Sequence, residues 1–408
     1  MLQQLLFGLL IFFLPSNLAF HFFPQAAIVQ GILVDYLIPK LYLTDIFILG
    51  ILVLWVISSW TDKRHAQSWQ ADRLAARACR TLSGQILLIS FFLITLLTGL
   101  LTSRPLASFW FWLKLVEMTL FISWLRYNLP ATRHVLHATL PLAVLWQSLL
   151  VIAQWFKQGN IFGYRFLGEP VFSLATPGIA RVSLGGSLKV LPYGTTPHPN
   201  VLAGFIAVSL VIIWLNSKSN PSKYIASIVG TFALFLTQSL SAWIALILAI
   251  AIGKKTTILL FPLFLLLFLN TQYFVLDTES VSRRLQLNLA AVKIWADHPL
   301  FGVGLNQFIP ALSSLPPIDP TLRFFQPVHN IYLLLLAETG LVGVGLLLFA
   351  LLKIVHSTSL RTILMILIIG LVDHYPLTLQ TGQLLLALAI GMSLSSPKQP
   401  NSDTLPEL

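Results

Sequence analysis

Long apolar stretches alternate with short polar segments along the whole chain. A transmembrane helix needs about 20 predominantly apolar residues. Several of the later stretches are shorter, so we expect tilted helices and a tight hairpin around Gln238. The pattern predicts twelve candidate helices, at about 2–20, 42–60, 82–101, 106–125, 136–156, 199–215, 224–238, 240–253, 256–270, 330–352, 362–373 and 380–395.

The composition excludes a soluble protein and an enzyme held by a single anchor. Of 408 residues, 56% are hydrophobic and only 10% are charged, whereas soluble chains carry roughly 25% charge. The mean hydropathy of +0.83 reflects apolar runs spread over the full length. The predicted fold class is an all-α, polytopic integral membrane protein with two long outer segments, at about 157–198 and 271–329, that contain short amphipathic helices.

Most basic residues fall in the segments that the twelve-helix plan places on the cytoplasmic side of the membrane. Cytoplasmic loops carry an excess of Lys and Arg, and a plan with both termini in the cytoplasm leaves only Lys40 and Arg104 in short outer loops. This accounts for much of the net charge of +11 without nucleic acid as a partner. The predicted inner segments hold fourteen basic residues: Lys63, Arg64, Arg73, Arg77, Arg80, Arg126, Arg133, Lys218, Lys223, Lys254, Lys255, Lys353, Arg361 and Lys398.

Eight further basic residues lie in the two long outer segments, to which the rule does not apply. The first carries four basic residues, including Arg181 and Lys189, against one acid, Glu169, which favours an anionic ligand. In the second, Leu285, Leu289, Val292 and Trp295 fall on one face of a predicted helix at 281–296. This pattern indicates a helix on the outer membrane interface or an ordinary surface helix.

His329 and the arginines are the candidates for chemistry. Histidine suits proton transfer because its reference pKa of ~6.5 lies near working pH, although a capping or interfacial histidine is the alternative at this membrane boundary. Arg283, Arg284 and Arg181 match phosphate oxygens with paired donors, although anionic lipid headgroups would also explain them. Ionisable groups within predicted spans are further candidates: Asp45, Lys114, Glu117, Glu338, Asp373 and His374.

Other familiar sites have no sequence signal. No Asp-x-Asp pair, metal-ligand spacing or Walker-type loop occurs, so we expect no metal and no cofactor. The single cysteine, Cys79, excludes a disulfide framework within one chain. Lys114 and Glu117 can pair on one helical face, and Asp373-His374 precedes Pro376 near the predicted outer surface, where it also fits a loop.

Three motifs in order resemble the O-antigen ligase and O-antigen polymerase superfamily. They are Gly-Thr-x-x-His-Pro-Asn at 194–200, an Arg-bearing outer helix followed by His-Pro-Leu-Phe-Gly-Val-Gly-Leu at 298–305, and His-Asn-x-Tyr at 329–332 with Glu-x-Gly at 338–340. His329 and Gly340 also reproduce the family spacing of a His, ten residues and a Gly. The family arginine falls on Arg284, or on Arg283 by a second alignment. Relatives often place another arginine before Tyr193, where Leu191 and Pro192 stand here, so Arg181 or Lys189 must substitute.

The resemblance implies an extracytoplasmic glycosyltransferase of the bacterial cytoplasmic membrane. Such enzymes move a glycan from an undecaprenyl diphosphate donor to a glycan, lipid or protein acceptor without a metal, with inversion. It implies catalysis by His329 and Arg284, diphosphate binding by Arg284, Arg283, Arg181 and Lys189, and supporting roles for His198, Asn200, Asn330, Glu338 and Gly340. We expect N-terminal helices at 1–156, an O-antigen ligase-like core at 157–352, C-terminal helices at 353–395 and a disordered cytoplasmic tail at 396–408.

Two other function classes stay open at this point. A transporter or flippase of lipid-linked glycans would share the spans, but we would expect charged groups along a path through the membrane. A noncatalytic envelope scaffold would leave the arrangement of Arg284 and His329 unexplained and would tolerate substitutions at both. The sequence does not identify the acceptor, and so it does not separate ligase, polymerase and protein O-glycosyltransferase.

Overall fold

Helices form most of the protein. The computed structural model describes residues 1–61, 74–216, 221–251, 278–316, 325–354 and 360–395. Within these residues, three helices are long and apolar enough to cross a membrane: α3 (Leu74–Leu100), α4 (Pro105–Lys157) and α11 (Ile331–Ile354). Outside the described residues lie the predicted span 256–270, Arg323, the tail 396–408 and the basic residues Lys63, Arg64, Arg73, Lys218, Lys254, Lys255 and Lys398.

The remaining apolar helices are shorter than a bilayer-spanning length of about 20 residues. The mostly helical fold class is confirmed, whereas the number of twelve transmembrane helices stays a prediction. The first helix is shorter than the predicted 2–20, since it ends at Phe12, three residues before Pro15. The shorter apolar helices are α1 (Leu2–Phe12), α2 (Leu43–Thr61), α5 (Pro199–Asn216), α6 (Pro221–Leu236), α7 (Leu240–Ala251), α12 (Leu360–Ile369) and α14 (Gln380–Leu394).

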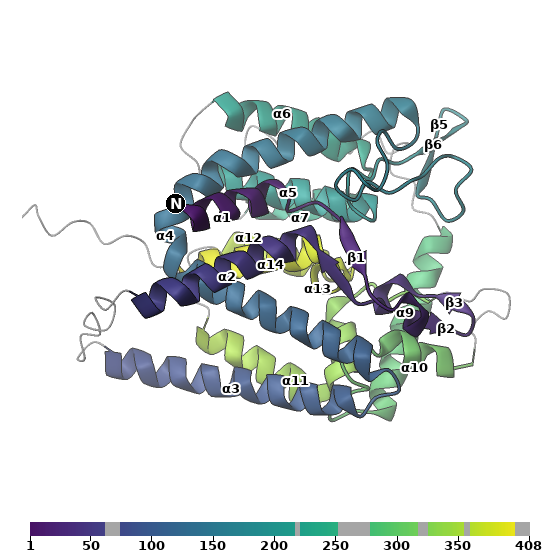
Figure 1. The fold of residues 1–408 in the computed structure, drawn as a ribbon. Helices are drawn as coiled ribbons and strands as arrows, with labels where there is room; N and C mark the ends of the chain where they lie inside the picture. The colour runs from purple at the N-terminus through teal and green to yellow at the C-terminus, as the bar shows by residue number, and fades with distance from the viewer. Residues whose placement is uncertain (62–73, 217–220, 252–277, 317–324, 355–359, 396–408) are drawn as a thin grey trace, which may run out of the picture.

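One helix, α4, contains both predicted spans 106–125 and 136–156. A straight helix of its 53 residues would be about 80 Å long. Near its start, Trp110 donates to the Lys40 carbonyl, whereas Tyr164, just beyond its end, accepts from the N–H of Ala19. Lys40 and Ala19 belong to paired strands, so both ends of α4 reach the same place. The helix therefore bends in its middle, near Pro130, and Figure 1 shows its two arms running from the bend back toward the end with the sheets, with other helices between them.

Small sheets and short helices gather at one end of the helical bundle (Figure 1). In residues 157–198, all of which are described, the prediction of a short amphipathic helix is wrong, because this segment forms the hairpin β5–β6. Antiparallel pairs also join β1 to β4 and β2 to β3. The strands are β1 (Ala19–His21), β2 (Ile28–Val29), β3 (Ile32–Leu33), β4 (Lys40–Tyr42), β5 (Arg181–Leu184) and β6 (Ser187–Val190), and the short helices are η1 (Pro24–Ala27), η2 (Asp35–Leu37), α10 (Phe308–Ser314) and α13 (Tyr375–Thr378).

Helix α5 forms the centre of the bundle. It is apolar all round, as expected of a helix that is packed on every side, and α4, α6, α7, α12 and α14 contact it. The turn predicted around Gln238 is confirmed, because this residue adopts a φ of 55° between α6 and α7. At Gly204 of α5, a Cβ would lie 1.7 Å from the Tyr375 hydroxyl. This close approach fixes α13 against α5.

The predicted amphipathic helix is confirmed as α9 (Thr278–Asp297), but its predicted apolar face does not pack on the protein. Leu285, Leu289 and Val292 are 60%, 62% and 44% exposed. Instead, Leu287, Ala290, Ala291 and Ile294 are buried, and three of them join a core with residues of α10 and α11: Leu287, Ala291 and Ile294. The helix therefore has one face on the protein and a second apolar face exposed.

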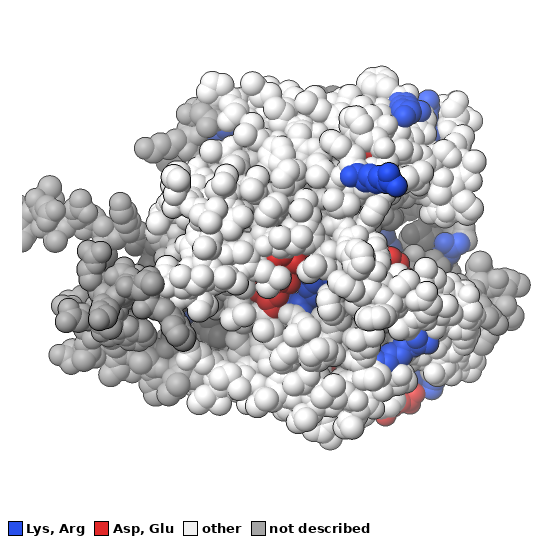
Figure 2. All heavy atoms as spheres, in the orientation of Figure 1, with Lys and Arg blue, Asp and Glu red and all other residues white. Residues whose placement is uncertain are grey.

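Charged side chains are sparse on the face seen in Figure 2 and gather toward the end that carries the sheets. A small group of acidic and basic side chains also lies in the middle of this largely apolar face. Lys114 of α4 pairs with Asp45 of α2, and its Nζ lies 3.2 Å from Oε2 of Glu117, which confirms the pairing predicted within α4. These ionisable groups compensate one another within the bundle.

Candidate active site

His329 lies directly before α11, at the end of the bundle that carries the sheets. The next residue, Asn330, caps this helix, since its Oδ1 accepts from the N–H groups of Tyr332 and Leu333 at 3.0 Å each. Asn330 Nδ2 also donates to the Leu371 carbonyl at 3.2 Å. This cap ties the start of α11 to the end of α12 and so holds His329 in place.

Two other histidines lie near His329. The rings of His329 and His374 meet edge to face with centroids 4.9 Å apart. His374 Nδ1 is 2.6 Å from Thr378 Oγ1, and its ring lies against Tyr36 at 5.4 Å. His198 stands just before α5 and accepts the N–H of Asn200 on its Nδ1 at 3.1 Å. Segments distant in sequence therefore meet at these rings.

Asp373 connects the cluster. Its Oδ2 accepts from Asn200 Nδ2 at 3.1 Å, and its Oδ1 accepts from the N–H of His374 at 2.9 Å. Burial disfavours its ionisation, but His374, His329, His198 and Arg284 together hold its pKa below the usual value. Asp373 is thus a buried carboxylate that joins the start of α5 to the segment before α13.

The histidines in this cluster are held neutral. Burial lowers the pKa of His329 to about 4; Asp373 opposes the shift, whereas Arg284 and His198 add to it. The pKa of His374 falls to about 3, chiefly because of burial. The pKa of His198 is lowered by the protein that surrounds it and by Arg284. A neutral imidazole has one nitrogen free to accept a proton.

Of the arginines expected to bind the diphosphate, Arg284 of α9 influences the cluster, because its charge lowers the pKa of His329 and of Asp373. Arg283 neighbours it on the same helix. Arg181 and Lys189 lie on the β5–β6 hairpin, where Arg181 pairs with Val190 and Lys189 with Val182. Residues paired across a hairpin share a face, so Arg181 and Lys189 point to opposite faces. Arg181 donates to the Thr176 carbonyl at 2.9 Å, and no described contact brings either residue to His329.

Glu338 and Gly340 shape the chain that follows α9. The Glu338 carboxylate accepts from the N–H groups of Asn306 at 2.9 Å and Phe308 at 3.2 Å. Gly340 interrupts α11 with φ 64° and ψ −171°, and the chain after it donates to the carbonyls of Pro299 and Leu300. Glu338 and Gly340 thus hold the loop after α9 against the kinked helix α11.

The family resemblance assigns no role to three residues that the structure places in or beside this histidine cluster: Asp373, His374 and Tyr36. A signal was present for two of them, because Asp373-His374 is an ionisable pair between apolar runs. Tyr36 gave no signal, since it lies in a short loop before α2. Among the described residues, no group of three or more His, Cys, Asp or Glu side chains has the arrangement of a metal site.

Comparison with known protein families gives a match to part of the chain. Residues 200–350 match the family model described as O-antigen ligase. No curated protein matches the chain. The matched segment runs from the Asn200 that holds Asp373, through Arg284 of α9, to His329 and the kink of α11. This match supports the resemblance of the segment to the O-antigen ligase and O-antigen polymerase superfamily.

Proposed function

We propose that the protein transfers a glycan from an undecaprenyl diphosphate-linked donor to an acceptor, on the outer face of a bacterial cytoplasmic membrane. The family match supports O-antigen ligase-type activity in general. The observation that carries the finer proposal is the buried His329, whose Nδ1 lacks a hydrogen-bond partner among the described residues, in the field of the Arg284 charge. A proton acceptor and a fixed cation are the two groups that such a transfer requires.

His329 is the proposed base. Its Nδ1 is buried and has no hydrogen-bond partner among the described residues. Buried polar atoms are normally paired, so this nitrogen is suited to receive the acceptor hydroxyl. Its neutral state lets it take the proton as the hydroxyl oxygen attacks the anomeric carbon. Asp373, whose charge favours the protonated ring, stabilises the imidazolium that forms and acts as a positioning residue.

Arg284 is the proposed diphosphate-binding group. The new bond joins the acceptor oxygen to the anomeric carbon as the bond from that carbon to the diphosphate oxygen breaks. The diphosphate leaves with the electron pair, and a guanidinium stabilises this charge through paired hydrogen bonds. Attack from the face opposite the leaving group inverts the anomeric centre. No metal takes part in these steps.

Transfer by the reconstituted protein tests the proposal. Purified undecaprenyl diphosphate glycan is supplied with candidate acceptors and EDTA, and the wild type is compared with a His329→Ala variant. We expect transfer by the wild type and its loss in the variant, with insertion and folding unchanged. Product length then separates a polymerase from a ligase.

Two results would contradict this proposal. Retained transfer in His329→Ala would remove the base, and loss of transfer with EDTA would show that a metal is required. Donor binding without transfer to any acceptor would make transport of lipid-linked glycans the leading function.

A further inference from the structure

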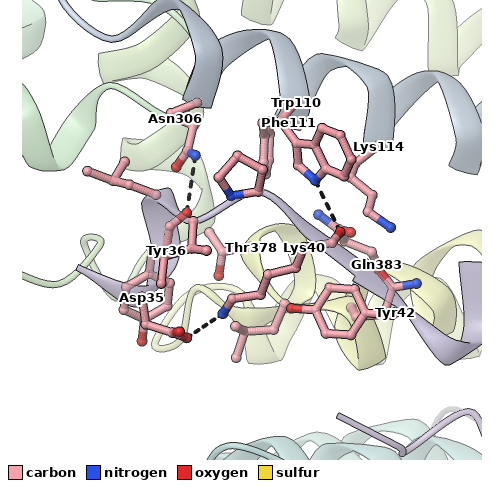
Figure 3. Close-up of a pocket in the computed structure, with 16 residues that line it drawn as sticks. Asp35, Tyr36, Lys40, Tyr42, Trp110, Phe111, Lys114, Asn306, Thr378 and Gln383 are labelled. Atoms are coloured by element: carbon pink, nitrogen blue, oxygen red, sulfur yellow. Dashed lines mark hydrogen bonds and ion pairs between the residues drawn. The ribbon is translucent and has the colours of Figure 1, made fainter. Parts of the chain in front are cut away.

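A pocket lies between the loop before α2, the start of α4, and helices α13 and α14 (Figure 3). The empty space in it, including the part open to solvent, is about 480 Å³. Aromatic rings form part of its lining: Tyr36, Tyr42, Trp110 and Phe111. Amide, hydroxyl and charged groups form much of the remainder, among them Asp35, Lys40, Lys114, Asn306, Thr378, Gln380 and Gln383.

The pocket adjoins the histidine cluster. Two of its lining residues, Tyr36 and Thr378, contact His374, which in turn lies 4.9 Å from His329 between ring centroids. Tyr36 and Thr378 also line a second hollow. Its other lining residues include Pro327, two residues before His329, and Glu338 of α11. A bound molecule can therefore extend from the pocket toward the proposed base.

Among the described residues, one buried acceptor in the pocket, on Gln380, has no donor. Gln380 is 4% exposed, and its Nε2 donates to Thr44 Oγ1 at 2.9 Å and to Asp45 Oδ1 at 2.5 Å. These two acceptors fix which end of the amide is the nitrogen. Its Oε1 is buried without a hydrogen-bond partner in the described part of the chain. A ligand hydroxyl would supply the missing donor.

The charges in the lining argue against an anionic ligand. Lys40 Nζ is 2.5 Å from Asp35 Oδ2, as Figure 3 shows, and Lys114 pairs with both Asp45 and Glu117. Both lysines are already neutralised, so a diphosphate would find no unpaired cation here. A sugar ring matches the lining, because its apolar face packs on aromatic rings while its hydroxyls meet the polar groups.

We propose that this pocket binds a neutral, hydroxyl-rich sugar unit of the acceptor and presents its hydroxyl toward His329. The inference rests on the proposed glycosyl transfer and adds the class of acceptor and its binding residues. Trp110 contributes a ring face, with its indole N–H held by the Lys40 carbonyl at 3.1 Å. Gln380 accepts from a sugar hydroxyl.

Ligand-observed saturation-transfer NMR on the protein in nanodiscs tests the pocket without catalysis. The neutral probes are maltotriose, cellotriose and N,N′-diacetylchitobiose, and the anionic probe is glucose 6-phosphate. We expect binding of at least one neutral probe, weakened about fivefold in Trp110→Ala by loss of the stacking ring. Gln380→Leu should weaken it as well.

Trp112→Ala is the matched control. Trp112 lies on the same helix and also donates its indole N–H to a backbone carbonyl, that of Phe92, but it does not line the pocket. Melting temperatures of all variants exclude loss of folding as the cause. Equal signals in Trp110→Ala and the wild type, binding of glucose 6-phosphate alone, or no binding of any neutral probe would overturn the inference.

Donor binding separates failure of this inference from failure of the proposed function. Retention of radiolabelled undecaprenyl diphosphate on immobilised nanodiscs should be normal in Trp110→Ala and lost in Arg284→Ala. Sugar binding should be weakened about fivefold in Trp110→Ala and normal in Arg284→Ala. Loss of both ligands in one variant would contradict separate sites.

Discussion

At His329, the surrounding residues decide the protonation state. Burial, the charge of Arg284 and the neighbouring His198 favour the neutral ring, whereas Asp373 favours the protonated ring. An exposed histidine would be partly protonated near neutral pH. In this position, the ring is available as a proton acceptor over most of the pH range in which the protein is expected to work.

The pH dependence of transfer follows from this state. A base must be deprotonated, and burial lowers the pKa of His329 to about 4 from 6.5. We expect transfer to be constant from neutral pH down to about pH 5 and to fall to half near pH 4. The unfolded chain binds a proton on this histidine at higher pH than the folded chain does, so folding stability should also fall as pH drops from 6.5 toward 4.

Initial rates across pH, with melting temperatures at each pH, check both expectations. An acid limb centred near pH 6.5, where an exposed histidine titrates, would contradict the neutral base.

Removal of the Asp373 carboxylate should lower the rate of transfer. In Asp373→Asn, the imidazolium on His329 would form without the opposite charge that now favours it. We expect kcat to fall about 100-fold or more, in the range typical of a disrupted acid–base pair, with little change in KM. Asp297→Asn is the control, because Asp297 is exposed and pairs with Lys293 at 3.6 Å on α9. A change in KM alone would assign Asp373 to substrate binding.

Among the elements, α11 packs against the segment after α9 by means of its kink at Gly340. The Gly340 φ of 64° brings the helix against the segment after α9, and an added Cβ would lie 2.3 Å from the Leu300 carbonyl oxygen. Gly340→Ala should therefore lower the free energy of unfolding by about 1–3 kcal/mol. Gly345→Ala on the same helix should not destabilise, since open space surrounds that position. Denaturation of both variants in matched lipid compares them, and equal stability would disprove the strain.

Helix α9 presents exposed Leu285, Leu289 and Val292 beside the charge-bearing Arg284. A lipid surface would cover this face and place Arg284 at headgroup level. An environment-sensitive fluorophore at Leu289→Cys, in a Cys79→Ala background, should show blue-shifted emission in nanodiscs. The same fluorophore at Ser183→Cys, on the exposed side of β5, should report water. Equal emission at both positions would favour an ordinary surface helix.

At the scale of the whole molecule, the bend of α4 sets which groups meet. Both ends of this helix lie with the sheets, whereas Ala131 lies in the bend. If the sheets face outward, Ala131→Cys in intact spheroplasts should resist an impermeant maleimide, and Ser183→Cys should react, again in a Cys79→Ala background. Labelling of Ala131→Cys from outside would invert the proposed orientation.

Much of the molecule follows from local sequence. Apolar runs indicated most of the helices, since a helix in lipid satisfies its own backbone hydrogen bonds. The spacing of His329 and Gly340, and the basic residues of α9, indicated the region that matches the O-antigen ligase family. The amphipathic pattern of α9 also predicted its helix, because periodicity is a local property.

Only the tertiary structure decided which side chains meet. The continuous, bent α4 could not be told from two spans, since Pro130 permits either a kink or a loop. Arg181 and Lys189 were as basic as Arg284, but hairpin pairing directs them to opposite faces. Asp373 and His374 approach His329 from a distant segment, and Tyr36 packs against His374 from another. Hydropathy and charge patterns describe each segment against its solvent, whereas a site depends on contacts between segments, and packing alone fixes those contacts.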